Sequence, residues 1–169
     1  MKLEEFIVFG HSLGGPIAIE LCTLFEKGVK SLILSEPNLE PSGHGDASFD
    51  IANLDADDLG NSLDKLIAEY EKEGNTMWSA TLRNWLPKAA YDLSKDAVKG
   101  GRVPWRTLLE QLDIPKSVIF GDQSLPNRDF EILKESDVNL EIVPNAGHSM
   151  AWENPAGLAQ AIKRCLSTK

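Results

Sequence analysis

The chain has 169 residues, of which 42% are hydrophobic, a composition that suits one compact domain with a buried core. Its formal net charge is −9, and its basic residues form no cluster beyond the pair Lys163-Arg164, which argues against binding to nucleic acid or to an anionic membrane. A small molecule is therefore the expected partner. The acidic start of the chain does not resemble a signal peptide or a membrane span, so we expect a cytoplasmic protein.

The N-terminal region predicts a strand, a helix and a second strand. Residues 6–9 form a continuous apolar run that ends in glycine, which is typical of a parallel strand buried on both faces. A helix is expected over residues 14–26 and a second buried strand over residues 29–35. The apolar residues expected on the buried face of the helix are Ile17, Leu21, Leu24 and Phe25. Because strand–helix–strand units build parallel sheets, the sequence predicts an α/β fold.

A change in composition marks residues 41–102 as a separate segment. A Gly/Ser/Asp-rich stretch leads into polar helical patterns that contain most of the aromatic residues. Helices are expected near residues 63–70, 78–85 and 89–99. We therefore expect a core formed by residues 1–40 and 103–169, and a helical insertion over residues 41–102.

The alternation of strands and helices resumes after Pro115. Strands are expected over residues 117–121 and 139–143, with a helix over residues 128–135 between them. Asn154-Pro155 is a strong start signal for a last helix, because asparagine caps helix N-termini and proline suits the first helical position. The residues expected on its buried face are Leu158, Ile162, Cys165 and Leu166.

The first strand and helix are joined by a G-x-S-x-G motif, Gly10-His11-Ser12-Leu13-Gly14. A serine on a sharp turn between a buried strand and a helix exposes its hydroxyl above the sheet edge, and the flanking glycines relieve crowding there. The helix N-terminus favours negative charge, so the Leu13 N–H is the expected oxyanion donor. Ser12 is therefore a candidate nucleophile, whereas His11 is expected to be a packing or pocket residue.

Residues 10–16, Gly-His-Ser-Leu-Gly-Gly-Pro, resemble the nucleophile elbow of the α/β-hydrolase superfamily. Residues 144–150, which follow the last expected strand, resemble the loop that carries the catalytic histidine in that family. The resemblance implies that His148 is the general base of a Ser-His-acid triad. It also implies a partial α/β-hydrolase fold, with a parallel sheet of about four strands, helices on both faces and a helical cap inserted over residues 41–102.

The resemblance leaves the acid of this triad open between two residues. The family commonly places the acid three residues after a glycine at the end of the next-to-last strand, but Ser124 stands at that position here. One candidate is Asp122, directly after Gly121, and the other is Glu36, at the end of the second strand, where some family members carry the acid. A carboxylate at the carboxyl end of a buried parallel strand lies in a region of low dielectric, which strengthens its bond to an imidazole. We therefore expect Glu36 to fill this role ahead of Asp122.

The resemblance covers only the latter part of the family fold, because the elbow begins at residue 10. The strands that precede the elbow in the family, and the loop that donates a second oxyanion N–H, have no counterpart in the sequence, which therefore reads as N-terminally truncated. We expect the strand over residues 6–9 to lie at an open sheet edge that pairs with a second copy or with a complementary chain. We also expect the isolated chain to be an impaired enzyme.

These features together predict a serine hydrolase that acts on a small ester or a related acyl compound and needs no metal or other cofactor. Trp78 and Trp85 are candidates for an apolar substrate pocket, together with His11 beside the nucleophile. The same triad also serves acyl transfer, C–C bond hydrolysis and cyanohydrin cleavage, so the reaction type stays open. The alternative is a non-catalytic remnant of the fold that acts as a binding or interaction module.

Overall fold

The structure, a computed structural model, describes residues 4–25 and 27–167. The chain divides into two units, one formed by residues 1–40 and 103–169 and the other by residues 41–102. The first unit contains a four-stranded sheet and the second is helical. Glu26, where the first expected helix ends, lies outside the described residues.

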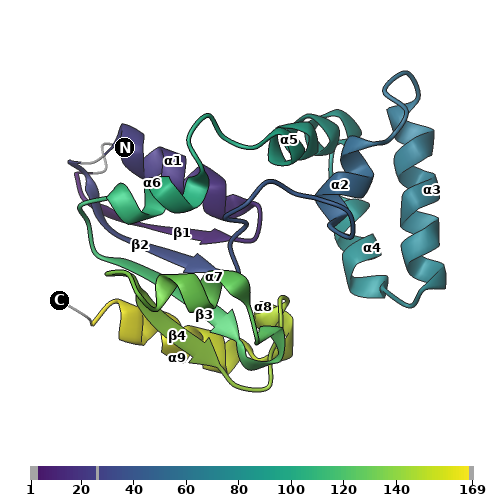
Figure 1. The fold of residues 1–169 in the computed structure, drawn as a ribbon. Helices are drawn as coiled ribbons and strands as arrows, with labels where there is room; N and C mark the ends of the chain where they lie inside the picture. The colour runs from purple at the N-terminus through teal and green to yellow at the C-terminus, as the bar shows by residue number, and fades with distance from the viewer. Residues whose placement is uncertain (1–3, 26, 168–169) are drawn as a thin grey trace. The chain divides into compact units, whose positions relative to one another are not determined.

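The first unit is built on a parallel sheet with the strand order β1-β2-β3-β4 (Figure 1). The strands are β1 (Phe6–His11), β2 (Val29–Ser35), β3 (Lys116–Gly121) and β4 (Asn139–Val143). His11 lies opposite Ser35, and Gly121 lies opposite Val143, so the carboxyl ends of the strands share one edge of the sheet. The α/β fold class with a parallel sheet of four strands is confirmed.

Helices cover both faces of this sheet. Their bounds are α1 (Gly14–Leu24), α6 (Trp105–Gln111), α7 (Arg128–Leu133), α8 (Met150–Glu153) and α9 (Pro155–Cys165), and a short 3-10 helix, η1 (Asp122–Ser124), follows β3. On one face, Leu34 and Phe120 of the sheet belong to a core that includes residues of α1, α6 and α7. On the other face, Ile33 and Ile119 belong to a core that includes residues of α8 and α9. The sheet is thus a central layer between two apolar cores.

The prediction of which face of α1 is buried is wrong. Ile17 is 52% exposed and Leu24 is 77% exposed, whereas Ile19 and Cys22 on the other side of the helix are fully buried. The helix carries apolar residues around most of its circumference, so two overlapping sets of residues satisfy a helical spacing. The spacing alone cannot tell which of the two sets packs against the sheet.

The prediction that the first strand is buried on both faces is also wrong. Val8 is buried, but Ile7 and Phe9 on the opposite face are 48% and 46% exposed. This follows from topology, because β1 ends the sheet and the core on that face is formed over β2, β3 and β4. Leu166, expected on the buried face of the last helix, is 49% exposed and lies just beyond the end of α9.

The second unit consists of helices with a small core of their own. The helices are α2 (Ala47–Ala52), α3 (Leu59–Lys72), α4 (Thr76–Leu82) and α5 (Pro87–Lys99). Ile51, Leu63, Ile67 and Leu82 are buried at the centre of this core. Pro87 occupies the first turn of α5, where its missing N–H costs no hydrogen bond.

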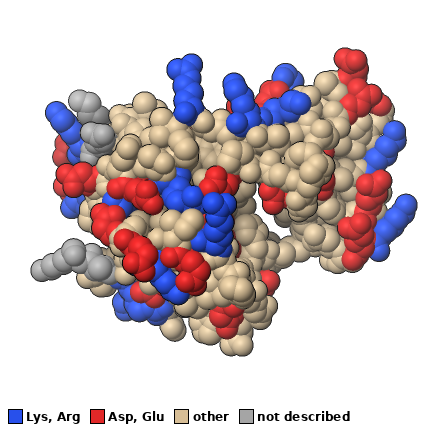
Figure 2. All heavy atoms as spheres, in the orientation of Figure 1, with Lys and Arg blue, Asp and Glu red and all other residues tan. Residues whose placement is uncertain are grey.

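The visible surface of the protein carries side chains of both charges. On the face drawn in Figure 2, acidic and basic side chains lie intermixed, and no large basic patch gathers there.

Across residues 4–25 and 27–167, none of the helices combines the length and the apolar character needed to cross a lipid bilayer.

Candidate active site

Ser12 lies on the turn between β1 and α1 with a backbone φ of +51°, in the left-handed region that non-glycine residues rarely adopt. A Cβ on Gly10 would approach the Gly14 carbonyl oxygen to 2.6 Å, and a Cβ on Gly15 would approach Pro37 Cβ to 2.6 Å. A Cβ on Gly14 would meet nothing within 4 Å. The crowded glycines are therefore Gly10 and Gly15, so the expectation of crowding at the second glycine of the motif is wrong.

His148 comes from the loop between β4 and α8, and its ring reaches the nucleophile turn. Its Nε2 lies 3.0 Å from Ser12 Oγ, within hydrogen-bonding distance. If Nδ1 carries the ring proton, Nε2 is an acceptor for the Ser12 hydroxyl proton. The His148 side chain is 56% exposed, so its ring is open to an incoming molecule from solvent.

Glu36 directly follows β2, with a φ of +44°, and is only 8% exposed. Its Oε1 accepts a hydrogen bond of 2.8 Å from the Gly121 N–H, and its Oε2 lies 3.9 Å from His148 Nδ1. Burial alone would raise the pKa of Glu36, but His148, the Gly121 N–H and the Ser124 hydroxyl outweigh burial and lower this pKa below its ordinary value. The carboxylate therefore stays ionised beside the imidazole at neutral pH.

Asp122 is the first residue after β3, and its carboxylate contacts the backbone of the histidine loop. Oδ2 accepts a hydrogen bond of 2.9 Å from the Asn145 N–H, and Oδ1 accepts one of 3.1 Å from the Ala146 N–H. These two bonds lower the pKa of Asp122. Of the two candidate acids, the structure thus places Glu36 beside the imidazole ring and directs Asp122 at the loop that carries it.

Two further predicted residues flank Ser12 in the sequence. Leu13 is the N-cap of α1, at the end where the first N–H groups of a helix lack intrahelical partners. The His11 ring lies 4.9 Å from the His148 ring, centroid to centroid, and its Nδ1 lies 3.0 Å from the Ser35 carbonyl oxygen. Partial burial, followed by the proximity of His148, lowers the pKa of His11. His11 thus contacts the candidate base while its Nδ1 is engaged by β2.

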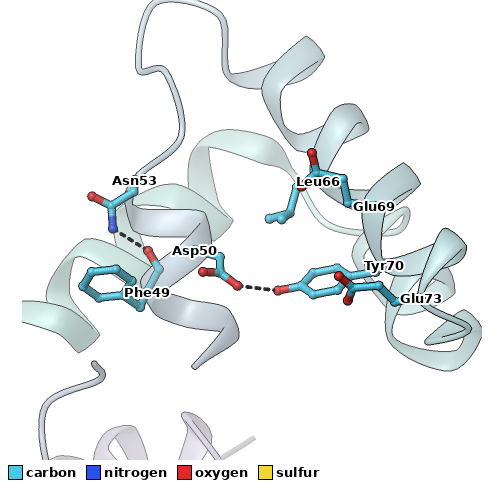
Figure 3. Close-up of a pocket in the computed structure, with 7 residues that line it drawn as sticks. All are labelled: Phe49, Asp50, Asn53, Leu66, Glu69, Tyr70 and Glu73. Carbon is cyan, nitrogen blue, oxygen red and sulfur yellow. Dashed lines mark hydrogen bonds between the residues drawn. The ribbon is translucent and has the colours of Figure 1, made fainter. Parts of the chain in front are cut away.

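Trp78 and Trp85, the predicted pocket aromatics, belong to the helical unit. Their rings meet edge to face at 5.5 Å and pack against the core of that unit. A hollow of about 300 Å³ lies within the same unit (Figure 3). Phe49 and Tyr70 line it together with acidic side chains, and the Tyr70 hydroxyl donates a hydrogen bond of 2.9 Å to Asp50. Neither tryptophan is among the residues that line this hollow.

Sequence reasoning missed Asn38, which contacts the candidate nucleophile. The Ser12 hydroxyl can donate to Asn38 Oδ1 over 3.3 Å, and the Asn38 N–H donates to the Ser12 carbonyl oxygen over 3.2 Å. The signal for Asn38 was its place two residues after Glu36, at the strand end where parallel sheets gather polar groups. Its amide oxygen, like His148 Nε2, lies within hydrogen-bonding distance of the Ser12 hydroxyl.

Backbone strain gathers at these same positions. Among the described residues, the non-glycine residues with positive φ are Ser12, Glu36 and Asn145. The first two are the candidate nucleophile and acid, and the third stands three positions before His148. Left-handed backbone at non-glycine residues is costly and clusters at functional sites, so this distribution supports a site at the carboxyl edge of the sheet.

Comparison with known proteins identifies the family. Residues 2–161 match the model of the alpha/beta hydrolase family, although no curated protein matches the chain. Similar solved structures include a deformylase from Pseudomonas putida S16, at 23% identity and a TM-score of 0.63, which covers 94% of this chain and 66% of that protein. An esterase from Thermogutta terrifontis is 20% identical, with a TM-score of 0.66 and coverage of 97% of this chain and 65% of that protein. A bromoperoxidase from Bacillus anthracis is 15% identical, with a TM-score of 0.71 and coverage of 98% and 68%.

These likenesses describe the fold, since all three identities lie below 25%. The chain spans about two thirds of the length of each of these solved structures, between 65% and 68%. The family model, by contrast, extends over nearly the whole of the sequence, from the residues before β1 to α9. The chain therefore belongs to the alpha/beta hydrolase family.

Proposed function

We propose that this chain carries the reacting residues of a serine hydrolase that acts on small esters or related acyl compounds. The observation that carries the proposal is the distance of 3.0 Å between Ser12 Oγ and His148 Nε2, with the buried carboxylate of Glu36 on the other side of the ring. A serine hydroxyl is activated when a base lies within reach of it and an acid orients that base. Membership of a hydrolase family supports the same reaction class.

The proposed reaction begins when His148 Nε2 accepts the Ser12 proton as Oγ attacks the acyl carbon. The carbonyl oxygen becomes an oxyanion that accepts a hydrogen bond from the Leu13 N–H, at the positive end of the α1 dipole. The ionised Glu36 stabilises the imidazolium, for which its 3.9 Å separation from Nδ1 must shorten toward hydrogen-bonding distance. His148 then protonates the leaving alcohol, and water, deprotonated by the same imidazole, hydrolyses the acyl-enzyme.

We expect a modest rate of ester hydrolysis from these 169 residues by themselves. Within the part of the chain that the structure describes, we assign a single backbone donor, the Leu13 N–H, to the oxyanion. Loss of one oxyanion donor typically lowers turnover by about 10²- to 10³-fold. We therefore propose that the isolated chain hydrolyses esters slowly, and that the wild-type rate must be compared with that of an inactive variant of the same chain.

Paired variants test the proposal. Ser12→Ala and His148→Ala should each lower kcat for a p-nitrophenyl ester by at least about 10³-fold. If the wild-type chain is slow, each variant should fall to the background rate of hydrolysis. The double variant should be little worse than either single variant, because the two residues act as a unit. His44→Ala is the matched control, since it removes an imidazole from the helical unit.

The same variants distinguish the enzyme from the alternative of a non-catalytic binding module. If the two single losses multiplied, the shared role of Ser12 and His148 would be wrong. If the wild-type chain and Ser12→Ala hydrolysed the ester at the same rate, the non-catalytic binding module would be the better description. Circular dichroism of each variant would show that the fold is retained.

We also propose that the open edge of β1 pairs with a second copy of this chain. β1 ends the sheet, and its Ile7 and Phe9 side chains are 48% and 46% exposed, which makes this edge an apolar template for another strand. Light scattering after size exclusion should find a dimer, and Phe9→Lys should shift it toward monomer. Ile142→Lys, at a 40% exposed position on the opposite edge strand β4, is the matched control. A wild-type monomer at micromolar concentration would contradict the pairing, and would leave a complementary chain as the remaining candidate.

A further inference from the structure

The loop between β4 and the candidate base is held by carboxylates along its backbone. Asp122 accepts hydrogen bonds from the Asn145 and Ala146 N–H groups, at 2.9 Å and 3.1 Å. Glu153, at the end of α8, accepts one of 2.7 Å from the Gly147 N–H. Three successive N–H groups directly before His148 therefore each donate to a carboxylate oxygen.

We infer that Asp122 and Glu153 are positioning residues that set the place of His148 through its backbone. This inference rests on the proposed function, and we call the two side chains the carboxylate clamp. Consecutive N–H groups that converge on anions form a concave backbone site, and the φ of +53° at Asn145 supplies the left-handed residue that such sites contain. Without the two carboxylates, these N–H groups would turn to water and the loop would lose its fixed geometry.

The exposure of His148 explains why its backbone matters. Its side chain is 56% exposed, and its ring lies 3.0 Å from Ser12 Oγ, 3.9 Å from Glu36 Oε2 and 4.9 Å from the His11 ring centroid. These neighbours orient the ring, but the backbone that carries a half-exposed side chain also sets where the ring lies. Displacement of a reacting group by about 1 Å can cost ~10²-fold in rate, so the loop needs to be fixed to a fraction of an ångström.

The clamp also connects His148 with Glu36. The Gly121 N–H donates to Glu36 Oε1 at 2.8 Å, and the next residue, Asp122, binds the histidine loop through its carboxylate. A Cβ on Gly121 would approach the Ala146 carbonyl oxygen to 2.2 Å, so the end of β3 and the loop are in direct contact. The pair Gly121-Asp122 thus links Glu36 to the loop that carries His148. The distance of 3.9 Å between Glu36 Oε2 and His148 Nδ1 depends on this link.

Asp122 and Glu153 accept different numbers of hydrogen bonds, so different substitutions test each residue. Asp122 uses both carboxylate oxygens, so Asp122→Asn places an amide NH2 against a backbone N–H and should lose one of the two bonds. Glu153 accepts one N–H, so Glu153→Gln keeps an acceptor, whereas Glu153→Ala does not. Glu131→Gln, an exposed carboxylate on α7 paired with Lys134, is the matched control for loss of one charge.

Ester hydrolysis by the wild-type chain and these variants gives the first readout. Asp122→Asn and Glu153→Ala should lower kcat by about 10-fold or more with KM nearly unchanged, since the displaced group acts in the chemical step. Glu153→Gln and Glu131→Gln should stay within about 3-fold of wild type. Equal losses for Glu153→Gln and Glu153→Ala would overturn the role of Glu153 as an acceptor, and a wild-type kcat for Asp122→Asn would overturn that of Asp122.

Amide exchange gives a second readout that does not need activity. By NMR, one of the Asn145 and Ala146 amides should exchange faster in Asp122→Asn, and the Gly147 amide should exchange faster in Glu153→Ala but not in Glu153→Gln. Unchanged exchange in both loss variants would overturn the clamp. A chain without esterase activity whose amides respond as described would instead refute the proposed function and leave the clamp standing as a structural device.

Discussion

The carboxyl ends of β2 and β3 carry the same kind of residue with different roles. Glu36 and Asp122 each stand directly after a parallel strand, and the two strands are neighbours in the sheet. Glu36 is buried, adopts a left-handed backbone conformation and lies beside the His148 ring, whereas Asp122 is exposed, starts a 3-10 turn and binds backbone N–H groups. A place at a strand end is therefore insufficient to assign a carboxylate its role, which depends on backbone conformation, burial and partner.

The largest expected effect is a difference between conservative amide substitutions at these two positions. Glu36→Gln removes the charge that stabilises the His148 imidazolium, so kcat should fall by about 10³-fold or more. Asp122→Asn should cost far less, because it loosens the loop without removing that charge. The reverse ranking, measured with a p-nitrophenyl ester and with both variants folded, would make Asp122 the acid.

An intermediate effect is expected at Ser124, whose hydroxyl contributes to the lowered pKa of Glu36. Ser124→Asp places a second carboxylate near Glu36, and like charges at close range disfavour ionisation of both. The acid limb of the pH–rate profile should therefore move to higher pH, with an activity loss of about 10-fold at neutral pH. Ser124→Asn is the uncharged control, and an identical pH profile for the two variants would contradict the proximity of Ser124 and Glu36.

The smallest expected effect concerns the dependence of stability on pH. Folding lowers the pKa of Glu36 from its ordinary value of 4.5, so its ionised form stabilises the folded state. That contribution is fully present above about pH 4.5 and is lost as the pH falls through the lower pKa of the folded state. Glu36→Gln should therefore show a smaller decrease in urea midpoint than wild type between about pH 5 and pH 3. A wild-type slope in the variant would mean that the pKa of Glu36 is not lowered by folding.

The sequence was sufficient for the fold wherever a pattern had one solution. The apolar run over residues 29–35 coincides with β2, and the start signal at Asn154-Pro155 coincides with the beginning of α9, where Asn154 Oδ1 accepts a hydrogen bond from the Gly157 N–H. The family resemblance depended on the two motifs that contain Ser12 and His148. Short helices such as α2 and α6 were missed, because six or seven residues contain too little periodicity to detect.

Where a sequence pattern allowed two arrangements, the three-dimensional structure was needed to choose between them. For α1, the set with Ile17 and Leu24 and the set with Ile19 and Cys22 both have helical spacing, and the sheet buries the second. The choice between Glu36 and Asp122 likewise depends on distances between segments far apart in the chain. The role of Asp122 in the clamp had no local signal, since its partners lie more than 20 residues away.

Labelling with a fluorophosphonate probe tests the central claim most directly, because the probe reports an activated serine without the need for a known substrate. Intact-mass analysis should show one adduct on the wild-type chain, and peptide mapping should place it on Ser12. Ser12→Ala should remain unlabelled, and His148→Ala should react far more slowly, since the hydroxyl then lacks its base. A wild-type chain that is folded yet unlabelled, or that reacts as fast in His148→Ala as in wild type, would contradict the assignment of Ser12 and His148 as nucleophile and base.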